Sequence, residues 1–119
     1  VTLETVFGDN NTMNDELSTD DNFTFMPKEF ALLGNYPNPF NPVTTLQFDL
    51  DYLSNVKVTI FNIRGNEVVT LQEGELEQGR HSLQWNASNA SGQKVPSGLY
   101  LYRVSSDSRT LTGKMLLLK

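Results

Sequence analysis

The stretch Tyr36-Pro37-Asn38-Pro39-Phe40-Asn41-Pro42 places three of the chain's five prolines within seven residues, directly before a series of short alternating segments. Proline fixes φ at about −65° and discourages helical geometry in the residue before it, so the stretch predicts a stiff, turned segment. Tyr36 and Phe40 stand four residues apart on this frame. We expect both rings to cover the end of an apolar core, because aromatic side chains on a stiff backbone bury area at low entropic cost.

Beyond this stretch, apolar residues alternate with polar ones at the period of two that is typical of half-buried strands. Leu46, Phe48 and Leu50, for example, are separated by Gln47 and Asp49. Strands are expected at residues 46–50, 56–60, 67–72, 79–85, 99–105 and 110–118. Turn residues separate these segments, and no sustained helical period is present. The pattern predicts an all-β fold, an immunoglobulin-like antiparallel β-sandwich of about seven strands.

The inward faces of these strands should form the core. The expected members are Leu46, Phe48, Val58, Ile60, Val69, Leu71, Leu83, Trp85, Tyr100, Tyr102 and Val104. Burial of about 150–250 Å² of Trp85, at about 25 cal/mol/Å², is favourable by roughly 4–6 kcal/mol before entropy. We therefore expect Trp85→Ala to cost more stability than any surface substitution.

Length and composition exclude several classes of protein. A chain of 119 residues suits one domain, and the absence of cysteine excludes disulfides, cysteine zinc sites and thiol nucleophiles. No apolar run is long enough to span a membrane, and no N-terminal signal peptide is apparent. Since the chain begins with Val1 rather than methionine, we expect it to be a piece of a larger protein.

Charge divides the chain into two parts. Residues 1–30 carry seven acidic groups and one basic group, a net charge of −6, and residues 31–119 carry seven acidic and eight basic groups, a net charge of +1. Nucleic-acid binding requires clustered basic residues, so this class is excluded. We interpret residues 1–30 as an acidic linker or arm and residues 31–119 as the sandwich. Apolar alternation in the arm, at Val1 and Leu3 and again at Phe23 and Phe25, suggests two short strands that pair within this domain, with an upstream domain or with another chain.

Few residues are candidates for chemistry. His81 is the only histidine, and we expect it to be an exposed strand residue. The acidic residues Glu73, Glu75 and Glu77 are interpreted as a soluble hairpin tip, because they lack the spacing of a calcium-binding loop. The polar residues 86–92 are interpreted as a turn. No Ser-His-Asp set or phosphate-binding loop is present, so we expect neither an enzyme nor a cofactor.

Several motifs together resemble one known family. They occur at Leu33–Pro42, Thr44–Phe48, Val58–Val68, Gly79–Asn86, Gly92–Arg103 and Gly113–Lys119. In this order they are similar to the C-terminal sorting domain of type IX secretion cargo, the type A Por secretion tail family, which is related to the immunoglobulin-like domain of flagellar hook-cap proteins. Asn86 and Asn89 stand where the family often has aspartate.

The resemblance implies a non-catalytic address label at the C-terminus of a protein from Bacteroidota. Such a label directs an upstream cargo domain from the periplasm through an outer-membrane translocon to the cell surface, and a sortase-like protease often removes it. Translocon and shuttle proteins would be its partners, and the apolar residues Met115 to Leu118 would offer a terminal strand edge for recognition. The residues predicted to carry the signal are Pro37, Asn38, Pro39, Phe40, Asn41, Pro42, Gly113, Lys114, Met115, Leu116, Leu117, Leu118 and Lys119.

Two alternatives remain at this stage. The first is a structural surface module that assembles into a filament by adding a strand from residues 1–30 to a neighbouring copy or domain. The second is a glycan-binding or adhesion module that uses Tyr100 and Tyr102 as a stacking platform. The second requires these tyrosines to face the solvent.

Overall fold

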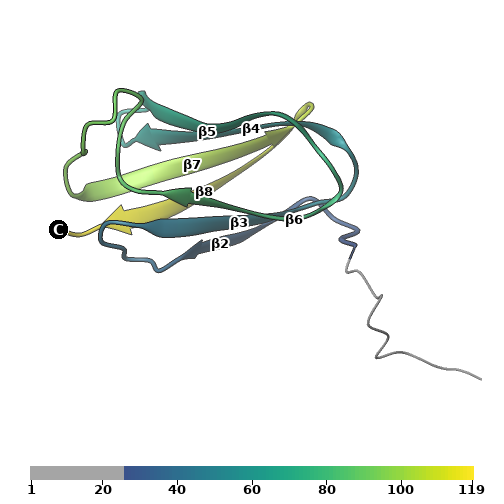
Figure 1. The fold of residues 1–119 in the computed structure, drawn as a ribbon, viewed down its shortest axis with the longest axis horizontal. Coiled ribbons are helices and arrows are strands. Elements are labelled where there is room, and N and C mark those ends of the chain that lie inside the picture. The colour runs from purple at the N-terminus through teal and green to yellow at the C-terminus, as the bar shows by residue number, and fades with distance from the viewer. Residues whose placement is uncertain (1–25) are drawn as a thin grey trace, which may run out of the picture.

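Seven strands pack as two antiparallel sheets in the computed structural model, which describes residues 26–119 (Figure 1). The strands are β2 (Ala31–Tyr36), β3 (Thr44–Leu50), β4 (Ser54–Asn62), β5 (Glu67–Leu76), β6 (Gly79–Trp85), β7 (Gly98–Ser106) and β8 (Arg109–Leu117). One sheet has the order β2-β3-β6 and the other the order β5-β4-β7-β8. The predicted immunoglobulin-like sandwich is confirmed. None of the described residues forms a helix long and apolar enough to cross a membrane.

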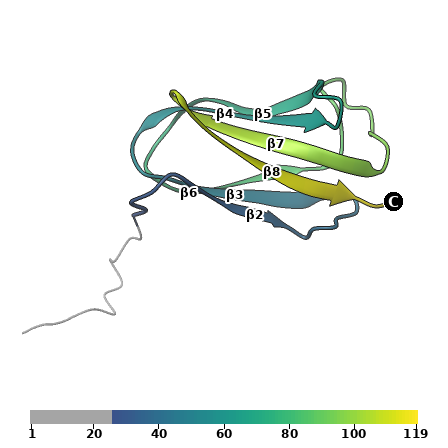
Figure 2. The same cartoon turned by 180° about the vertical axis from the view of Figure 1, so that it is seen from behind.

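The edge strands of the two sheets lie in pairs on opposite sides of the sandwich, β5 with β6 and β2 with β8. Figure 1 views the side on which β5 and β6 lie, and Figure 2 views the side on which β2 and β8 lie. The described segment that leads into β2 and the C-terminus lie at opposite ends of the long axis of the sandwich (Figure 2). All the strand pairs are antiparallel, as period-two alternation with short turns favours.

Strand β2 was not among the strands expected from the sequence. Its pairing with β3 shifts register between Leu32 and Gly34, so Leu33 forms an irregularity that interrupts the alternation. Gly34 has a φ of +102°, in the region that glycine occupies at little cost. The bulge hides the period of two, which is why the pattern alone did not reveal this strand.

Most of the expected core is confirmed. Eight of the expected residues are buried: Leu46, Phe48, Val58, Ile60, Trp85, Tyr100, Tyr102 and Val104. Val69, Leu71 and Leu83 pack against this core but are only half-buried, because they lie on the edge strands β5 and β6. Residues that were not among the expected members complete the core: Leu50, Val56, Ala87, Val95, Met115 and Leu117.

The acidic residues after Gln72 do not form a hairpin tip. Strand β5 continues to Leu76, with Glu73 opposite Lys57 and Glu75 opposite Asn55 on β4. The ladder with β4 extends the strand past the point where the sequence suggested a turn, and opposite charges across the strands favour this pairing. The expectation was wrong for Glu73 and Glu75, which are exposed strand residues.

The loop that follows Trp85 is a turn, as predicted. The Oδ1 atom of Asn89 accepts hydrogen bonds from the backbone N–H groups of Ser91 at 2.9 Å and Gln93 at 3.0 Å. The indole Nε1–H of Trp85 donates to the carbonyl of Ser88 at 2.9 Å. The loop therefore supplies the partner that a buried indole requires.

Arg109 binds several segments at the end of the sandwich where β8 begins. Its guanidinium donates to both carboxylate oxygens of Asp51, at 2.8 and 2.9 Å, and to the hydroxyl of Ser106 at 2.9 Å. The same group lies 4.7 Å from the ring centroid of Phe30 and 4.5 Å from that of Tyr52. The guanidinium thus connects Phe30, the β3–β4 loop and the start of β8.

Candidate functional site

The proline-rich turn lies against the C-terminal strand. The backbone N–H of Phe40 donates to the carbonyl of Leu116 at 3.0 Å, and the N–H of Leu118 donates to the carbonyl of Phe40 at 3.1 Å. These bonds form a parallel bridge between Phe40 and Leu117. The two segments that the sequence predicted to carry a signal therefore meet in space, 76 or more residues apart in the chain.

The side chain of Asn38 extends this pairing. Its Oδ1 atom accepts a hydrogen bond from the N–H of Leu116 at 3.0 Å, and its Nδ2 group donates to the carbonyl of Lys114 at 3.4 Å. Pro37 and Pro39 have no N–H group, so their backbone cannot donate to the strand. The carboxamide of Asn38 presents one acceptor and donors in the manner of a peptide group, which explains the choice of asparagine at this position.

A buried threonine holds the turn in place. Thr44 is fully buried, and its hydroxyl donates to the carbonyl of Pro37 at 2.8 Å. The Nδ2 group of Asn35 in turn donates to the hydroxyl oxygen of Thr44 at 3.0 Å. Asn35 at the end of β2 and Thr44 at the start of β3 thus hold the backbone of the turn in place.

The ring of Phe40 anchors the turn in the core. It is 2% exposed and lies 5.7 Å from the ring centroid of Trp85, which lies 5.3 Å from that of Tyr100 in an edge-on arrangement. The hydroxyl of Tyr100 donates to the carbonyl of Pro96 at 2.6 Å, and burial raises the pKa of this phenol. The prediction that Phe40 covers the end of the core is confirmed.

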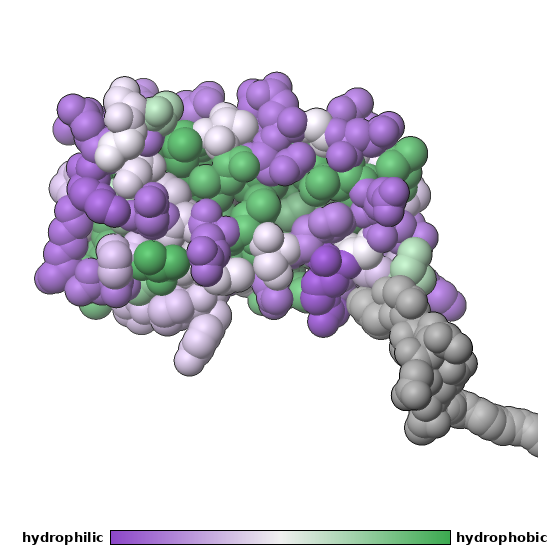
Figure 3. All heavy atoms as spheres, in the orientation of Figure 1, coloured by the Kyte–Doolittle hydropathy of each residue, from purple (hydrophilic) through white to green (hydrophobic). Residues whose placement is uncertain are grey.

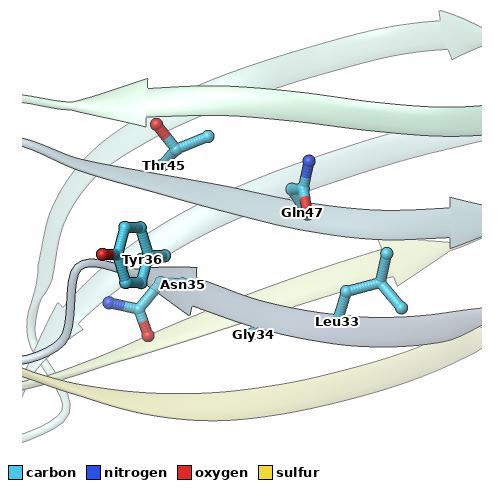
Figure 4. A pocket seen from close by; sticks show the side chains of 6 residues that line it. All are labelled: Leu33, Gly34, Asn35, Tyr36, Thr45 and Gln47. Atoms are coloured by element: carbon cyan, nitrogen blue, oxygen red, sulfur yellow. The ribbon is translucent and has the colours of Figure 1, made fainter.

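The same prediction is wrong for Tyr36, whose side chain is 83% exposed. Alternation along β2 directs Asn35 towards Thr44 and leaves Tyr36 on the outer face, beside a shallow hollow of about 240 Å³. Figure 4 shows the residues that line this hollow, Leu33, Gly34, Asn35, Tyr36, Thr45 and Gln47. Strand alternation, rather than proximity to the prolines, decides which aromatic ring enters the core.

The last residues of the chain divide between core and surface. Met115 and Leu117 are buried, Gly113 and Leu116 are half-buried, and the exposed members are Lys114, Leu118 and Lys119. A Cβ atom at Gly113 would overlap the ring of Tyr102 on the neighbouring strand, so only glycine fits beneath this buried tyrosine. The backbone N–H of Lys119 donates to the hydroxyl of Ser97 at 3.1 Å.

The edge of β8 at Leu116 and Leu118 is therefore not open. The hydrogen bonds to Asn38 and Phe40 occupy the backbone groups that an incoming strand would use. Recognition at this end of the domain would instead involve side chains that protrude around the junction. These are Pro37, Asn38, Pro39, Asn41, Pro42, Lys114, Leu118 and Lys119, and we refer to them as the junction surface.

The junction offers no catalytic arrangement. Among residues 26–119, no three His, Asp or Glu side chains are placed to hold a metal ion. His81 is half-buried rather than exposed, because it faces inward, where its ring stacks on Phe48 at 5.5 Å and one ring nitrogen lies 2.8 Å from the carbonyl of Glu77. Tyr100 and Tyr102 are 4% and 3% exposed, so they form no stacking platform for a glycan.

The two antiparallel sheets and their strand order define an immunoglobulin-like β-sandwich. More particularly, the chain belongs to the FlgD Ig-like domain family, whose profile matches residues 41–110. The match ends before Gly113 and begins after Phe40, so most of the junction lies outside it. Asn38 and Phe40 on one side and Gly113 to Lys119 on the other lie outside the matched residues.

Solved structures of similar fold include parts of two proteins from Porphyromonas gingivalis. Dimeric latent PorU from Porphyromonas gingivalis has a TM-score of 0.61 and 23% identity over 79% of this chain and 10% of its own. PorZ, an essential surface component of the type IX secretion system of the same organism, has a TM-score of 0.52 and 22% identity over 71% of this chain and 11% of its own. FlgD from P. aeruginosa has a TM-score of 0.48 and 26% identity, covering 63% of this chain and 60% of that one.

These likenesses concern the fold. The chain spans about a tenth of the length of PorU and PorZ. The search of curated proteins found no match.

The contact between the two predicted signal segments was not anticipated from the sequence. The available clue was Asn38, an amide-bearing residue between two prolines that cannot donate hydrogen bonds. The carboxamide of such a residue can bind the unpaired N–H and C=O groups of a strand edge. Nothing in the local pattern, however, identified β8 as that edge.

Proposed function

We propose that this domain is a non-catalytic C-terminal secretion and sorting signal for the type IX secretion system. It would direct an upstream cargo domain from the periplasm to the cell surface, where a sortase-like protease would be one of its partners. The ordered motifs of the sequence support this proposal, as does the likeness in fold to PorZ, a surface component of that system.

The observation that carries the proposal is the junction itself. Asn38 and Phe40 bind the backbone of Lys114 to Leu118, so the proline-rich turn and the final strand form one surface rather than two. A receptor such as the outer-membrane translocon or a shuttle protein would contact both segments at once. Such a surface exists only in the folded domain. A translocon that binds it would therefore accept cargo whose C-terminal domain has already folded.

A reporter fusion tests the proposal. Residues 23–119 are fused to a periplasmically exported reporter in a host that has the type IX system, and surface and medium reporter are compared with a system-deficient strain. We expect export that depends on the system and that is lost when residues 113–119 are deleted. Undiminished export of the truncated fusion would refute the role of the junction.

Truncation removes core residues as well, so a surface variant separates signalling from folding. Lys114→Glu with Leu118→Ser changes two exposed side chains of the junction surface, Leu118 being 49% exposed. Lys28→Glu with Leu53→Ser makes the same chemical changes at exposed positions elsewhere, Leu53 being 54% exposed. We expect both variants to fold and only the first to lose export; equal export by the two would contradict the proposal.

A further inference from the structure

One side of the sandwich is open. Among the described strands, β5 pairs only with β4 and β6 only with β3, so each has an edge on this side that no described strand occupies. The loop 86–92 reaches the edge of β5 at one point, where the N–H of Ala90 donates to the carbonyl of Val68 at 3.1 Å. Between the two edges lie Val69 and Leu71 from β5 and Leu83 from β6, all half-buried. Figure 3 views this side and shows hydrophobic residues along the middle of the molecule between polar margins. We refer to this depression as the β5–β6 groove.

The groove is hollow at the end that lies near the junction. A cavity of about 480 Å³ is lined there by Val69, Leu71 and Trp85, together with residues of the polar loop 86–92. The opposite side of the sandwich differs, because Asn38 and Phe40 cover the edge of β8 there. An unpaired edge beside apolar side chains is a template for strand addition, and natural proteins usually cover such edges.

The chain itself arrives at the other end of this groove. Pro27 is buried, and its carbonyl accepts a hydrogen bond at 2.9 Å from the Nε2 group of Gln78, which lies in the turn between β5 and β6. The start of the described chain, at Pro27, therefore lies beside the turn where β6 begins. A segment that leads towards this point along the groove runs antiparallel to β6.

The sequence just before Met26 suits such a strand. Asn22-Phe23-Thr24-Phe25 alternates aromatic and polar residues, and aromatic and β-branched residues favour strands. The residues before it, Asp20 and Asp21, are acidic and would lie beyond the apolar part of the groove, near the polar loop 86–92. Alternation over this length directs both phenylalanine rings to the same face.

We propose that residues 22–25 of this chain bind the free edge of β6 as an additional antiparallel strand and cover the β5–β6 groove. If Pro27 lies opposite Gly79, Phe25 lies opposite His81 and Phe23 lies opposite Leu83. Both His81 and Leu83 face inward, so both phenylalanine rings enter the groove. Thr24 and Asn22 then lie opposite Ser82 and Gln84, whose side chains are exposed on the outer face.

This pairing has two physical consequences. It would convert the three-stranded sheet into a four-stranded one and remove the edge most exposed to association with other chains. It would also hold whatever precedes residue 22 at a fixed position, beside the loop 86–92, rather than on a flexible tether. The proposal is independent of secretion, because it concerns only the chain's own residues.

Disulfide trapping tests the register directly, since the chain contains no cysteine. The pairs Thr24→Cys with Ser82→Cys and Asn22→Cys with Gln84→Cys place the new thiols on facing positions about 4.5–5.5 Å apart at Cβ, close to disulfide distance. Thr24→Cys with Thr112→Cys is the matched control, because Thr112 is an exposed residue on β8, on the other side of the sandwich. The oxidation rate of each full-length variant is measured by non-reducing electrophoresis.

We expect an intramolecular disulfide that forms at least ten-fold faster in one or both facing pairs than in the control. Equal rates in all three variants would overturn the proposal. Disulfide-linked dimers whose rate rises with protein concentration would also overturn it, because a second copy would then occupy the groove. Faster oxidation of Asn22→Cys with Thr70→Cys would place the segment on β5 instead and refute the assignment to β6.

Amide hydrogen exchange provides a second measurement without cysteine. In the full chain, Phe23→Asp with Phe25→Asp should accelerate exchange at the β6 amides that do not bond to β3 by ten-fold or more. Val6→Asp with Phe7→Asp, the same kind of change elsewhere in the arm, should leave those amides unaffected. Identical β6 protection in the unsubstituted protein and both variants would show that residues 22–25 do not cover this edge.

Discussion

Replacing Phe40 with alanine tests the claim that the proline-rich turn is anchored in the core. The ring is 2% exposed and packs on Trp85. Burial of about 150–250 Å² at about 25 cal/mol/Å² corresponds to roughly 4–6 kcal/mol, and measured Phe→Ala substitutions in cores cost about 3–5 kcal/mol. Since a domain of this kind has a free energy of unfolding of about 5–15 kcal/mol, a cost of about 4 kcal/mol for Phe40→Ala should remove about a quarter or more of the stability.

Urea unfolding measures this loss. With a slope of about 2 kcal/mol/M, a cost of about 4 kcal/mol lowers the midpoint by about 2 M. Tyr36→Ala is the control, because this aromatic residue stands on the same turn but is 83% exposed, and its removal should change stability by no more than about 0.5 kcal/mol. A cost below about 1 kcal/mol for Phe40→Ala, or equal costs for the two variants, would refute the reasoning.

Three further predictions concern the C-terminal strand and the titratable groups. Gly113→Ala should cost about 1–3 kcal/mol in urea unfolding, because the new methyl group overlaps the ring of Tyr102; a neutral result would mean that this ring moves freely. Hydrogen bonds from Arg109 lower the pKa of Asp51, so stability from this pair is present above the ordinary carboxyl value of about 4 and is lost as the pH falls through the lowered pKa. Urea midpoints measured down to about pH 2 should therefore fall less steeply for Arg109→Gln than for the unsubstituted protein, and parallel curves would contradict the pairing. Burial raises the pKa values of Tyr100 and Tyr102, so the stability that their neutral phenols provide is present below about pH 10 and is lost as the pH rises through the raised values. The phenolate absorbance of these two residues should appear together with loss of near-ultraviolet circular dichroism, and ionisation well before unfolding would argue that they are accessible.

Much of the fold was predictable because strand alternation is a local property. Leu46, Phe48, Val58 and Ile60 were assigned to the core from their spacing, and all four are buried. Leu83 was assigned on the same grounds but is only half-buried, because β6 has no described neighbour beyond it. Alternation identifies the inward face of a strand, but it does not tell whether that strand lies at the centre or the edge of a sheet.

The candidate site was predictable only in its parts. Both Asn38 and the residues around Leu116 were named from the sequence as parts of a signal, yet their hydrogen bonds to each other join positions 78 residues apart. Local composition carries no information about such a distant pairing. The expected open edge at Met115 to Leu118 proved to be occupied for the same reason.

The sequence by itself determined the all-β class, the alternation of most strands, the near-neutral charge of the sandwich and the stiffness of the proline-rich turn. These follow from side-chain chemistry and backbone sterics within a few residues of each position. The tertiary structure alone decided that Phe40 enters the core while Tyr36 faces the solvent, that the turn closes one side of the sandwich, and that the β5–β6 side stays open among the described residues. Those outcomes depend on which strands become neighbours, and neighbours are chosen by the packing of two sheets as a whole.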